Sequence, residues 1–200
     1  MKSYLITNPK YYPRFAIAHY AARSYTARFP NFICLRDKGF LGYEREAMRF
    51  LRGLRRVRSH LVLHDRFDVA LRLRSRGFKF FALHLSGAKF RLISRSARLG
   101  ITTIVSCRNE NEMRSAIKKG AKFVTISPIF ATDKSGDTRD LLGVEFLANL
   151  PIEILKKTIA LGGIATDREI GAIKKTAKAQ AKPEAFAFAS IRYFTPRRSL

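Results

Sequence analysis

The chain has 200 residues and a formal net charge of +24 at pH 7, from 39 Lys and Arg against 15 Asp and Glu. Its hydrophobic content of 46% is enough for a sizeable core and excludes wholesale disorder. No apolar run is long enough to span a membrane. The apolar stretch near the first residue is too short for a secretory signal. The two cysteines, Cys34 and Cys107, are too few for a disulfide framework. We expect a single compact domain over residues 1–200, in the cytoplasm, with a charge that attracts anions.

Short runs of β-branched and aromatic residues alternate with stretches of helical period along the whole chain. The expected strands cover residues 4–7, 32–35, 61–64, 79–85, 101–106, 123–128, 158–161 and 185–189. This alternation predicts an α/β fold, and a doubly wound sheet would show it as well. The number of eight strands favours a (β/α)8 TIM barrel.

Arginines gather on the helices expected in the second quarter of the chain. The helix expected at 44–58 places an apolar stripe on one face and, on another, Arg45, Arg49, Arg52 and Arg56. The stretch 91–99 repeats this pattern, and consecutive helices are neighbours in a barrel, so we expect one basic outer surface. We interpret it as a solvated helix exterior. The alternative is a patch for RNA, DNA or an anionic membrane, although no aromatic stacking platform accompanies it.

Polar and cationic residues follow the expected strand ends, where a barrel carries its functional site. Arg36 and Lys38 follow the second strand and Lys134 follows the sixth, so they provide positive charge for phosphate oxygens. The Gly162–Gly163 pair after the seventh strand lets backbone N–H groups approach a phosphate, and Ser190 at the eighth strand adds a hydroxyl.

Several of these residues also have a purely structural interpretation. Asp65, after the third strand, suits Mg²⁺, which takes one or two carboxylates plus substrate phosphates, but it could also cap the helix that begins near Asp68. Gly162–Gly163 could be a tight turn, and Asp37 is expected to form an ion pair with its basic neighbours. We expect His84, at the end of an apolar strand, to be packed or hydrogen-bonded rather than a base. No Ser-His-Asp, HExxH or Walker pattern is present.

Six segments of the chain occur in an order typical of one known family. They read Tyr-Leu-Ile-Thr-Asn at 4–8, Leu-Arg-Asp-Lys at 35–38, Leu-His-Asp-Arg-Phe-Asp-Val-Ala-Leu at 63–71, His-Leu at 84–85, Ser-Pro-Ile-Phe-Ala-Thr at 127–132 and Ala-Leu-Gly-Gly-Ile at 160–164. In these segments the chain resembles the thiamine phosphate synthase/TenI family. The resemblance implies a (β/α)8 barrel and a transferase of thiamine biosynthesis. Such an enzyme joins hydroxymethylpyrimidine diphosphate to thiazole phosphate and releases pyrophosphate.

The resemblance also implies roles for the residues at the strand ends. Arg36, Lys38 and Lys134 would hold the diphosphate, Ser106 would contact the departing pyrophosphate, and Asp65 would bind Mg²⁺. The implied mechanism is dissociative, so the enzyme contributes mainly charge neutralisation and positioning.

The second substrate has its own implied contacts. Thr132 and Gly163, next to Gly162 and with Ser190 behind them, would hold the thiazole phosphate.

The chain departs from the family pattern at five places. Cys34 stands where the synthase motif has Gln, and His64, an expected substrate contact, replaces an Asn beside the metal-binding Asp65. Lys89 occupies the position of a second Mg²⁺ carboxylate, where it would face the substrate diphosphate as a cation. The loop at 132–134 lacks one hydroxyl residue, and Arg108 replaces the His of TenI-type tautomerases.

These observations support three hypotheses about function. The first is a thiamine phosphate synthase-like transferase acting on phosphorylated small molecules. The second is a catalytically degenerate TenI-like protein that binds a phosphorylated ligand or regulates. The third is a nucleic-acid-associated protein that uses the basic surface. A homo-oligomer is compatible with each of them.

Overall fold

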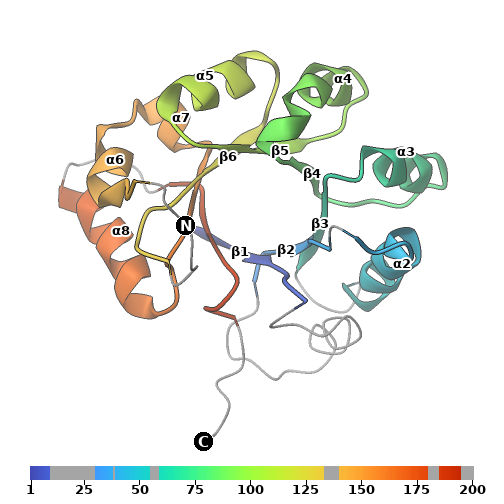
Figure 1. The fold of residues 1–200 in the computed structure, drawn as a ribbon, viewed down its shortest axis with the longest axis horizontal. Helices are drawn as coiled ribbons and strands as arrows, with labels where there is room; N and C mark the ends of the chain where they lie inside the picture. Colours follow the sequence, from blue (N-terminus) through green and yellow to red (C-terminus); the bar gives the residue numbers. More distant parts are fainter. Residues whose placement is uncertain (10–29, 38, 55–58, 133–139, 180–184, 195–200) are drawn as a thin grey trace, which may run out of the picture.

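The computed structural model describes residues 1–9, 30–37, 39–54, 59–132, 140–179 and 185–194. Eight strands form a closed barrel in which each strand pairs in parallel with the next, and β8 pairs with β1 (Figure 1). The predicted TIM barrel is therefore confirmed. The strands are β1 (Lys2–Ile6), β2 (Phe32–Leu35), β3 (His60–His64), β4 (Ala82–Leu85), β5 (Thr103–Cys107), β6 (Phe123–Ile126), β7 (Thr158–Leu161) and β8 (Ala187–Ser190).

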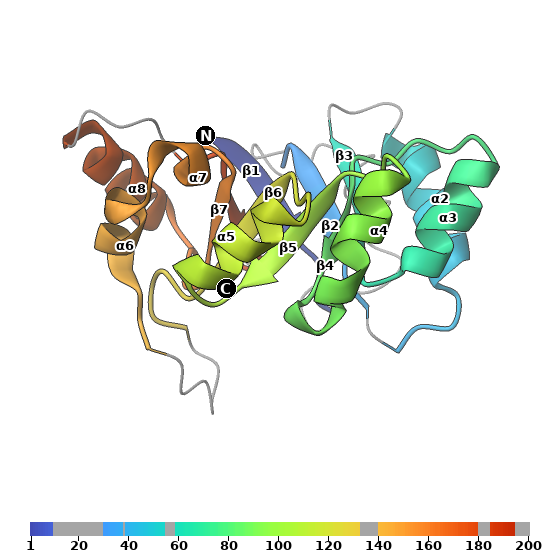
Figure 2. The same cartoon turned by 90° about the horizontal axis from the view of Figure 1, so that it is seen from above.

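Helices cover the outside of the barrel in chain order (Figures 1 and 2). They are α2 (Tyr43–Leu54), α3 (Phe67–Ser75), the 3-10 helix η1 (Gly87–Leu92), α4 (Ile93–Arg98), α5 (Glu110–Lys118), α6 (Gly143–Asn149), α7 (Ile152–Leu155) and α8 (Asp167–Ala179). The helix predicted at 44–58 corresponds to α2, and residues 55–58, with Arg56, lie outside the described residues.

Four strand predictions extended too far at one end by more than one residue, because β4 begins at Ala82, β5 at Thr103 and β8 at Ala187, while β6 ends at Ile126. The run 79–85 is mostly apolar, but β4 begins only at Ala82, because Phe80 belongs to the entry loop and packs against the core from there. The run 123–128 ends as a strand at Ile126, because Pro128 has no N–H group to continue the ladder.

The strands bury both of their faces, as expected of a parallel barrel. In β2, Phe32 and Cys34 point to the barrel interior, while Ile33 and Leu35 join the larger core between the sheet and the helices. This alternation follows from the two-residue period of a strand. It explains why the strands appear in the sequence as nearly continuous apolar runs.

Stacked aromatic rings fill the barrel interior at the amino ends of the strands. Phe123 and Phe186 have ring centroids 4.0 Å apart with an interplanar angle of 19°, and Phe32 and Phe81 have centroids 4.3 Å apart at 29°. Such rings add to stability beyond the area they bury. With this end occupied by rings, the polar groups lie toward the carboxyl ends of the strands.

Ion pairs use part of the basic outer surface to join neighbouring helices. Glu44 of α2 accepts hydrogen bonds from Arg72 of α3 at 2.7 Å and from Arg76 at 2.9 Å. The guanidinium carbon of Arg95 in α4 lies 5.2 Å from the ring centroid of Phe67 in α3. These three arginines therefore have a structural role, which supports the interpretation of this surface as a helix exterior.

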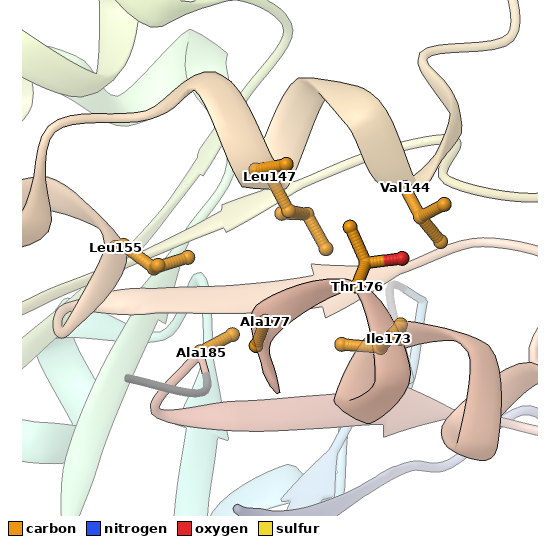
Figure 3. Close-up of a pocket in the computed structure, with 8 residues that line it drawn as sticks. Val144, Leu147, Leu155, Ile173, Thr176, Ala177 and Ala185 are labelled. Carbon is orange, nitrogen blue, oxygen red and sulfur yellow. The ribbon is translucent and has the colours of Figure 1, made fainter. Parts of the chain in front are cut away.

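A small apolar cavity of about 10 Å³ lies between α6 and α8 (Figure 3). Its lining includes Val144, Leu147, Leu155, Ile173, Thr176 and Ala177. A cavity of this size is at the lower limit for a single water molecule, and the apolar lining offers few polar partners. We interpret it as a packing gap. Separately, none of the described helices is long and apolar enough to cross a membrane.

Candidate functional site at the mouth of the barrel

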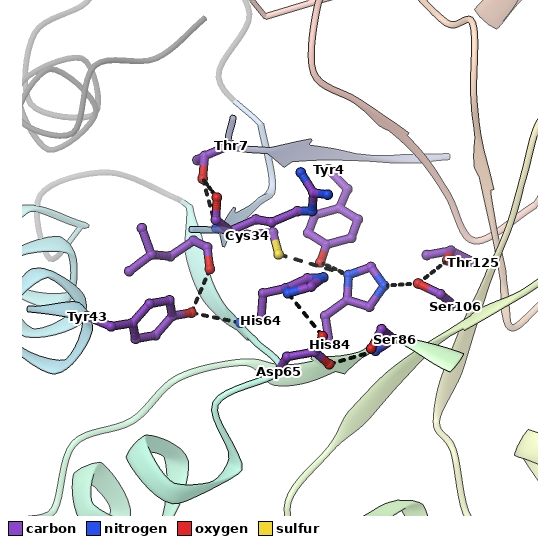
Figure 4. Close-up of polar contacts among 12 residues, drawn as sticks. Tyr4, Thr7, Cys34, Tyr43, His64, Asp65, His84, Ser86, Ser106 and Thr125 are labelled. Atoms are coloured by element: carbon purple, nitrogen blue, oxygen red, sulfur yellow. Dashed lines mark hydrogen bonds and ion pairs between the residues drawn. The ribbon is translucent and has the colours of Figure 1, made fainter. Parts of the chain in front are cut away.

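The carboxyl ends of β1 to β5 bring polar side chains from distant parts of the sequence to one place (Figure 4). Thr7, directly after β1, accepts a hydrogen bond at its Oγ1 from the backbone N–H of Arg36 at 2.8 Å. The backbone N–H of Thr7 in turn donates to the carbonyl oxygen of Cys34 at 3.0 Å. These bonds fix the start of the loop that carries the predicted phosphate contact Arg36, whose side chain is partly exposed.

Tyr43 is a supporting residue that the sequence analysis missed. Its hydroxyl donates to the carbonyl oxygen of Leu35 at 2.6 Å and accepts from the backbone N–H of His64 at 2.8 Å. Burial raises the pKa of Tyr43 above its usual value, so the hydroxyl stays protonated. Tyr43 therefore ties the ends of β2 and β3 together from α2. Only its place in an otherwise apolar helix face could have pointed to this role.

His84 lies at the centre of a chain of polar contacts inside the barrel. Its Nδ1 atom is 2.8 Å from the hydroxyl of Tyr4, and its Nε2 atom is 2.9 Å from Oγ of Ser106. The Thr125 hydroxyl donates to the same Ser106 oxygen at 3.4 Å. Burial, followed by the nearby charges of His64 and Arg36, holds the pKa of His84 well below its usual value. The prediction of a hydrogen-bonded histidine is confirmed.

Both cysteines are free and buried, as the sequence indicated. Cys34 has its Sγ atom 4.0 Å from Nδ1 of His84, and burial raises the pKa of its thiol to about 12. Burial raises the pKa of Cys107 to about 12 as well. A nucleophilic cysteine needs a lowered pKa, so neither thiol is suited to nucleophilic chemistry near neutral pH.

Asp65 connects the ends of β3 and β4 and does not cap the following helix. Its Oδ1 atom accepts from the backbone N–H of Ser86 at 2.8 Å, and its own N–H donates to the carbonyl oxygen of His84 at 2.9 Å. The capping interpretation is wrong, because α3 begins at Phe67 with Arg66 in the N-cap position and without a side-chain cap. Asp65 has a φ of 55°, a left-handed conformation that Asp tolerates better than most residues.

Asp65 is also the carboxylate that the sequence suggested as a ligand of Mg²⁺. Its Oδ2 atom lies 3.6 Å from Nδ1 of His64, and its side chain is 21% exposed, so a carboxylate oxygen can be reached from solvent. The described part of the chain contains no group of three or more His, Cys, Asp or Glu side chains that could hold a metal ion. The residues therefore fit the minimal case, in which one carboxylate contacts Mg²⁺ and phosphate oxygens and water complete the shell.

The remaining predicted contacts are distributed around the mouth. Lys89 lies half-buried in η1, and its backbone N–H donates to the carbonyl oxygen of Ser86 at 2.8 Å, which places it on the loop that also bonds Asp65. Thr132 is half-buried after β6. Lys38 and Lys134 lie outside the described residues.

Gly162 and Gly163 form a tight turn after β7, with φ values of 101° and 67°. The carbonyl oxygen of Gly162 accepts from the backbone N–H of Phe130 at 3.1 Å, so the turn is fastened to the loop after β6. Ser190 lies behind it, donates from Oγ to the carbonyl oxygen of Ile164 at 2.5 Å and accepts from Tyr193 N–H at 3.0 Å. The Ser190 proton is therefore directed to the backbone.

A closed parallel eight-stranded barrel with its polar side chains at the carboxyl ends of the strands defines this chain as a TIM-barrel protein whose candidate site lies at the mouth. Within that class, residues 3–185 match the family model described as thiamine monophosphate synthase. The chain belongs to this family, as the resemblance predicted.

Individual relatives agree with the family match. A thiamine-phosphate synthase of Syntrophomonas wolfei is 34% identical over 113 residues, which cover 56% of this chain and 52% of that protein. One of Lactococcus lactis is 24% identical over 173 residues, 82% of this chain and 78% of that protein. The match to the first of these thus spans about half the length of the relative.

A solved structure shows the same fold. The structure described as thiamine phosphate pyrophosphorylase from Pyrococcus furiosus superposes with a TM-score of 0.73 over 98% of this chain and 88% of that chain, at 19% identity. At that identity the likeness concerns the fold.

Proposed function

We propose that this protein is a transferase that joins hydroxymethylpyrimidine diphosphate to thiazole phosphate. The bond between the pyrimidine methylene carbon and the diphosphate oxygen breaks, and pyrophosphate leaves with the electron pair. The thiazole nitrogen then donates its lone pair to the methylene carbon, which gives thiamine phosphate. The observation that carries the proposal is the position of Ser106 at the mouth of a barrel of this family, with its oxygen held by His84 and Thr125.

Charge neutralisation is the main task in such a reaction, because negative charge accumulates on the departing pyrophosphate. Arg36, which follows β2, would contact the diphosphate oxygens. Lys38 and Lys134, which lie outside the described residues, are proposed to contact them as well. Ser106 would donate a hydrogen bond to the leaving group. His64 and Lys89 flank Asp65 and Ser86 and would complete this half of the site.

The thiazole phosphate would lie at the opposite side of the mouth. Thr132 and the backbone of Gly163 would contact it. Ser190 would act indirectly, because its proton is bonded to Ile164 and it holds the turn in place.

Mg²⁺ is part of the proposal as a cofactor that Asp65 would contact. When bound, the ion would neutralise phosphate charge. The chain's own residues hold the rest of the site: Ser86 N–H orients the Asp65 carboxylate, and His64 lies beside its second oxygen.

The proposed partners are phosphorylated small molecules, and the proposed location is the cytoplasm. The two buried free thiols are compatible with a reducing compartment, where cysteines stay unpaired.

The test is an activity assay with purified protein, both substrates and Mg²⁺, in which pyrophosphate and thiamine phosphate are both quantified. The proposal expects equal amounts of the two products, and a loss of both when Ser106 is replaced in Ser106→Ala. Ser94→Ala is a matched control, because the Ser94 hydroxyl bonds the backbone of Lys119 on the outer surface.

Two other results would contradict the proposal. Saturable binding of the diphosphate without any product would favour the ligand-binding hypothesis. Steeply salt-dependent RNA binding that is lost in an Arg49→Gln, Arg52→Gln variant, again without product, would favour the nucleic-acid hypothesis.

A further inference from the structure

The ring nitrogens of His84 have different neighbours, and this difference determines which of them carries the proton. Nδ1 faces the Tyr4 hydroxyl at 2.8 Å and the Cys34 sulfur at 4.0 Å, whereas Nε2 faces the Ser106 hydroxyl at 2.9 Å. His84 is buried, and burial favours the neutral ring, which has one N–H donor and one acceptor nitrogen.

The Tyr4 hydroxyl decides the tautomer. Tyr4 is fully buried and keeps its proton, since burial raises its pKa well above the usual value. The candidate acceptors beside it are Nδ1 of His84 and the Cys34 sulfur, and a thiol sulfur is a weak acceptor. Tyr4 therefore donates to Nδ1. The single ring proton of His84 then lies on Nε2 and is donated to Oγ of Ser106.

The hydrogen-bond partners of Ser106 determine where its own proton points. Its oxygen has two acceptor sites and one proton. His84 Nε2–H occupies one acceptor site, and the Thr125 hydroxyl, at 3.4 Å, occupies the other. The Ser106 proton is left for a group outside this cluster.

We propose that Tyr4 and His84 are positioning residues that fix Ser106 as a hydrogen-bond donor toward an anionic ligand group in the mouth of the barrel. That the anion is pyrophosphate rests on the proposed function. In the opposite tautomer Ser106 would donate its proton to Nε2 and direct an oxygen lone pair toward the anion. That arrangement is repulsive. The hydrogen bonds from Tyr4 to His84 and from His84 to Ser106 therefore determine whether Ser106 attracts or repels the anion.

The first test measures the tautomer by ¹⁵N NMR of the histidines in the whole protein, with His84→Gln to assign the signals. We expect protonated Nε2 and unprotonated Nδ1 near neutral pH. In Tyr4→Phe, which removes only the hydroxyl, we expect part of the population to move to the Nδ1–H form. Protonated Nδ1 as the main form in the wild-type protein would overturn the inference.

Two variants serve as controls for this measurement. Cys34→Ala removes the other neighbour of Nδ1 and should leave the tautomer unchanged. Tyr43→Phe also removes a buried hydroxyl, but one that bonds the backbone of Leu35 and His64. It should destabilise the protein without changing the His84 tautomer, so a change there would count against a specific role of Tyr4.

The second test uses inorganic pyrophosphate as the probe and calorimetry as the readout. We expect Ser106→Ala to weaken binding by about 10- to 100-fold, the value of a hydrogen bond to a charged group, and Tyr4→Phe by about 2- to 10-fold. The double variant should bind no more weakly than Ser106→Ala alone, because Tyr4 acts through Ser106. Additive losses would show that Tyr4 acts by another route and would overturn the inference.

The two proposals can fail separately. If the protein forms no thiamine phosphate but shows the Nε2–H tautomer and the non-additive binding losses, the proposed function fails and the positioning role stands. If thiamine phosphate forms while Nδ1 is protonated, the function stands and the positioning role fails.

Discussion

Gly163 lies directly against the carbonyl oxygen of Ala131, so that the turn after β7 and the loop after β6 meet backbone to backbone. A Cβ atom at Gly163 would overlap that oxygen and would come within 2.5 Å of the carbonyl oxygen of Phe130. This contact joins the two loops on the side where the thiazole phosphate is proposed to bind.

Gly163→Ala is expected to destabilise the protein. The φ of 67° alone costs a residue with a Cβ about 1–2 kcal/mol, and the overlap with Ala131 adds to this. Urea denaturation should therefore show a loss of at least about 2 kcal/mol in the free energy of unfolding.

Gly171→Ala is the matched control. Gly171 lies within α8, and a Cβ there meets no atom within 4 Å. This variant should gain about 0.5–1 kcal/mol, because Ala is the better helix former. Equal effects of the two substitutions would contradict the packing explanation.

Two buried hydroxyls in the core are expected to weaken the fold. The Oγ atom of Ser96 in α4 and Oγ1 of Thr103 in β5 are buried and have no hydrogen-bond partner among the residues that the structure describes. Because such a group loses its water without compensation, Ser96→Ala and Thr103→Val should each raise the free energy of unfolding by about 1 kcal/mol. A decrease in thermal or urea stability of both variants would show that the hydroxyls have partners in solution.

Stability is expected to fall as the pH falls below about 6.5, the ordinary pKa of histidine. In the folded protein the pKa of His84 lies well below that value, because of burial and then of the nearby His64 and Arg36. Below pH 6.5 the unfolded chain therefore binds a proton that the folded chain does not, and stability decreases by up to about 1.4 kcal/mol per pH unit. Above that pH the contribution is constant.

The measurement is the free energy of unfolding between pH 4.5 and 7.5. His84→Gln should reduce the slope in this range, because the buried ring is then absent. The lowered pKa of Asp68, about 2, adds a separate loss only below its ordinary value of 3.8, where the unfolded carboxyl binds a proton that the folded carboxylate does not. A slope that persists in His84→Gln would assign the effect to another group.

Asp65→Asn separates the charge of this residue from its hydrogen bonding. The amide oxygen of Asn can still accept the N–H of Ser86, so the unfolding free energy should change by less than about 1 kcal/mol. If the carboxylate contacts Mg²⁺, activity of the variant should no longer respond to Mg²⁺, as measured in a titration of the metal. Retention of the full wild-type response would rule out this contact.

Much of the barrel could be predicted because its signals are local. The segments 32–35 and 158–161 were predicted with the bounds of β2 and β7, since each is a short apolar run between polar segments. The start of β4 was misplaced, because Phe80 is as apolar in the loop as it would be in a strand. Hydrophobicity reports burial, and a packed loop is buried as well.

The candidate site could be predicted only in part from such local signals. The residue types at the strand ends could be read in order, and a motif shared with a family pointed to several of them. The supporting residues could not be found, because Tyr43 lies in a helix and bonds to two strands by its side chain. Nor could the bond of Asp65 to Ser86 be distinguished from a helix cap, since both use the same carboxylate.

The sequence by itself determined the number of strands and their order along the chain, because these follow from periods of two and 3.6 residues. Only the tertiary structure decided that Tyr4 and His84, 80 positions apart, would share a hydrogen bond. The bond depends on the closure of β8 on β1 and on the stagger of the strands, which place inward-facing side chains of β1, β4 and β5 together. The alternation of residues along a strand specifies which face of the sheet a residue occupies. It does not specify the residue's position along the barrel axis, and so does not specify its partner.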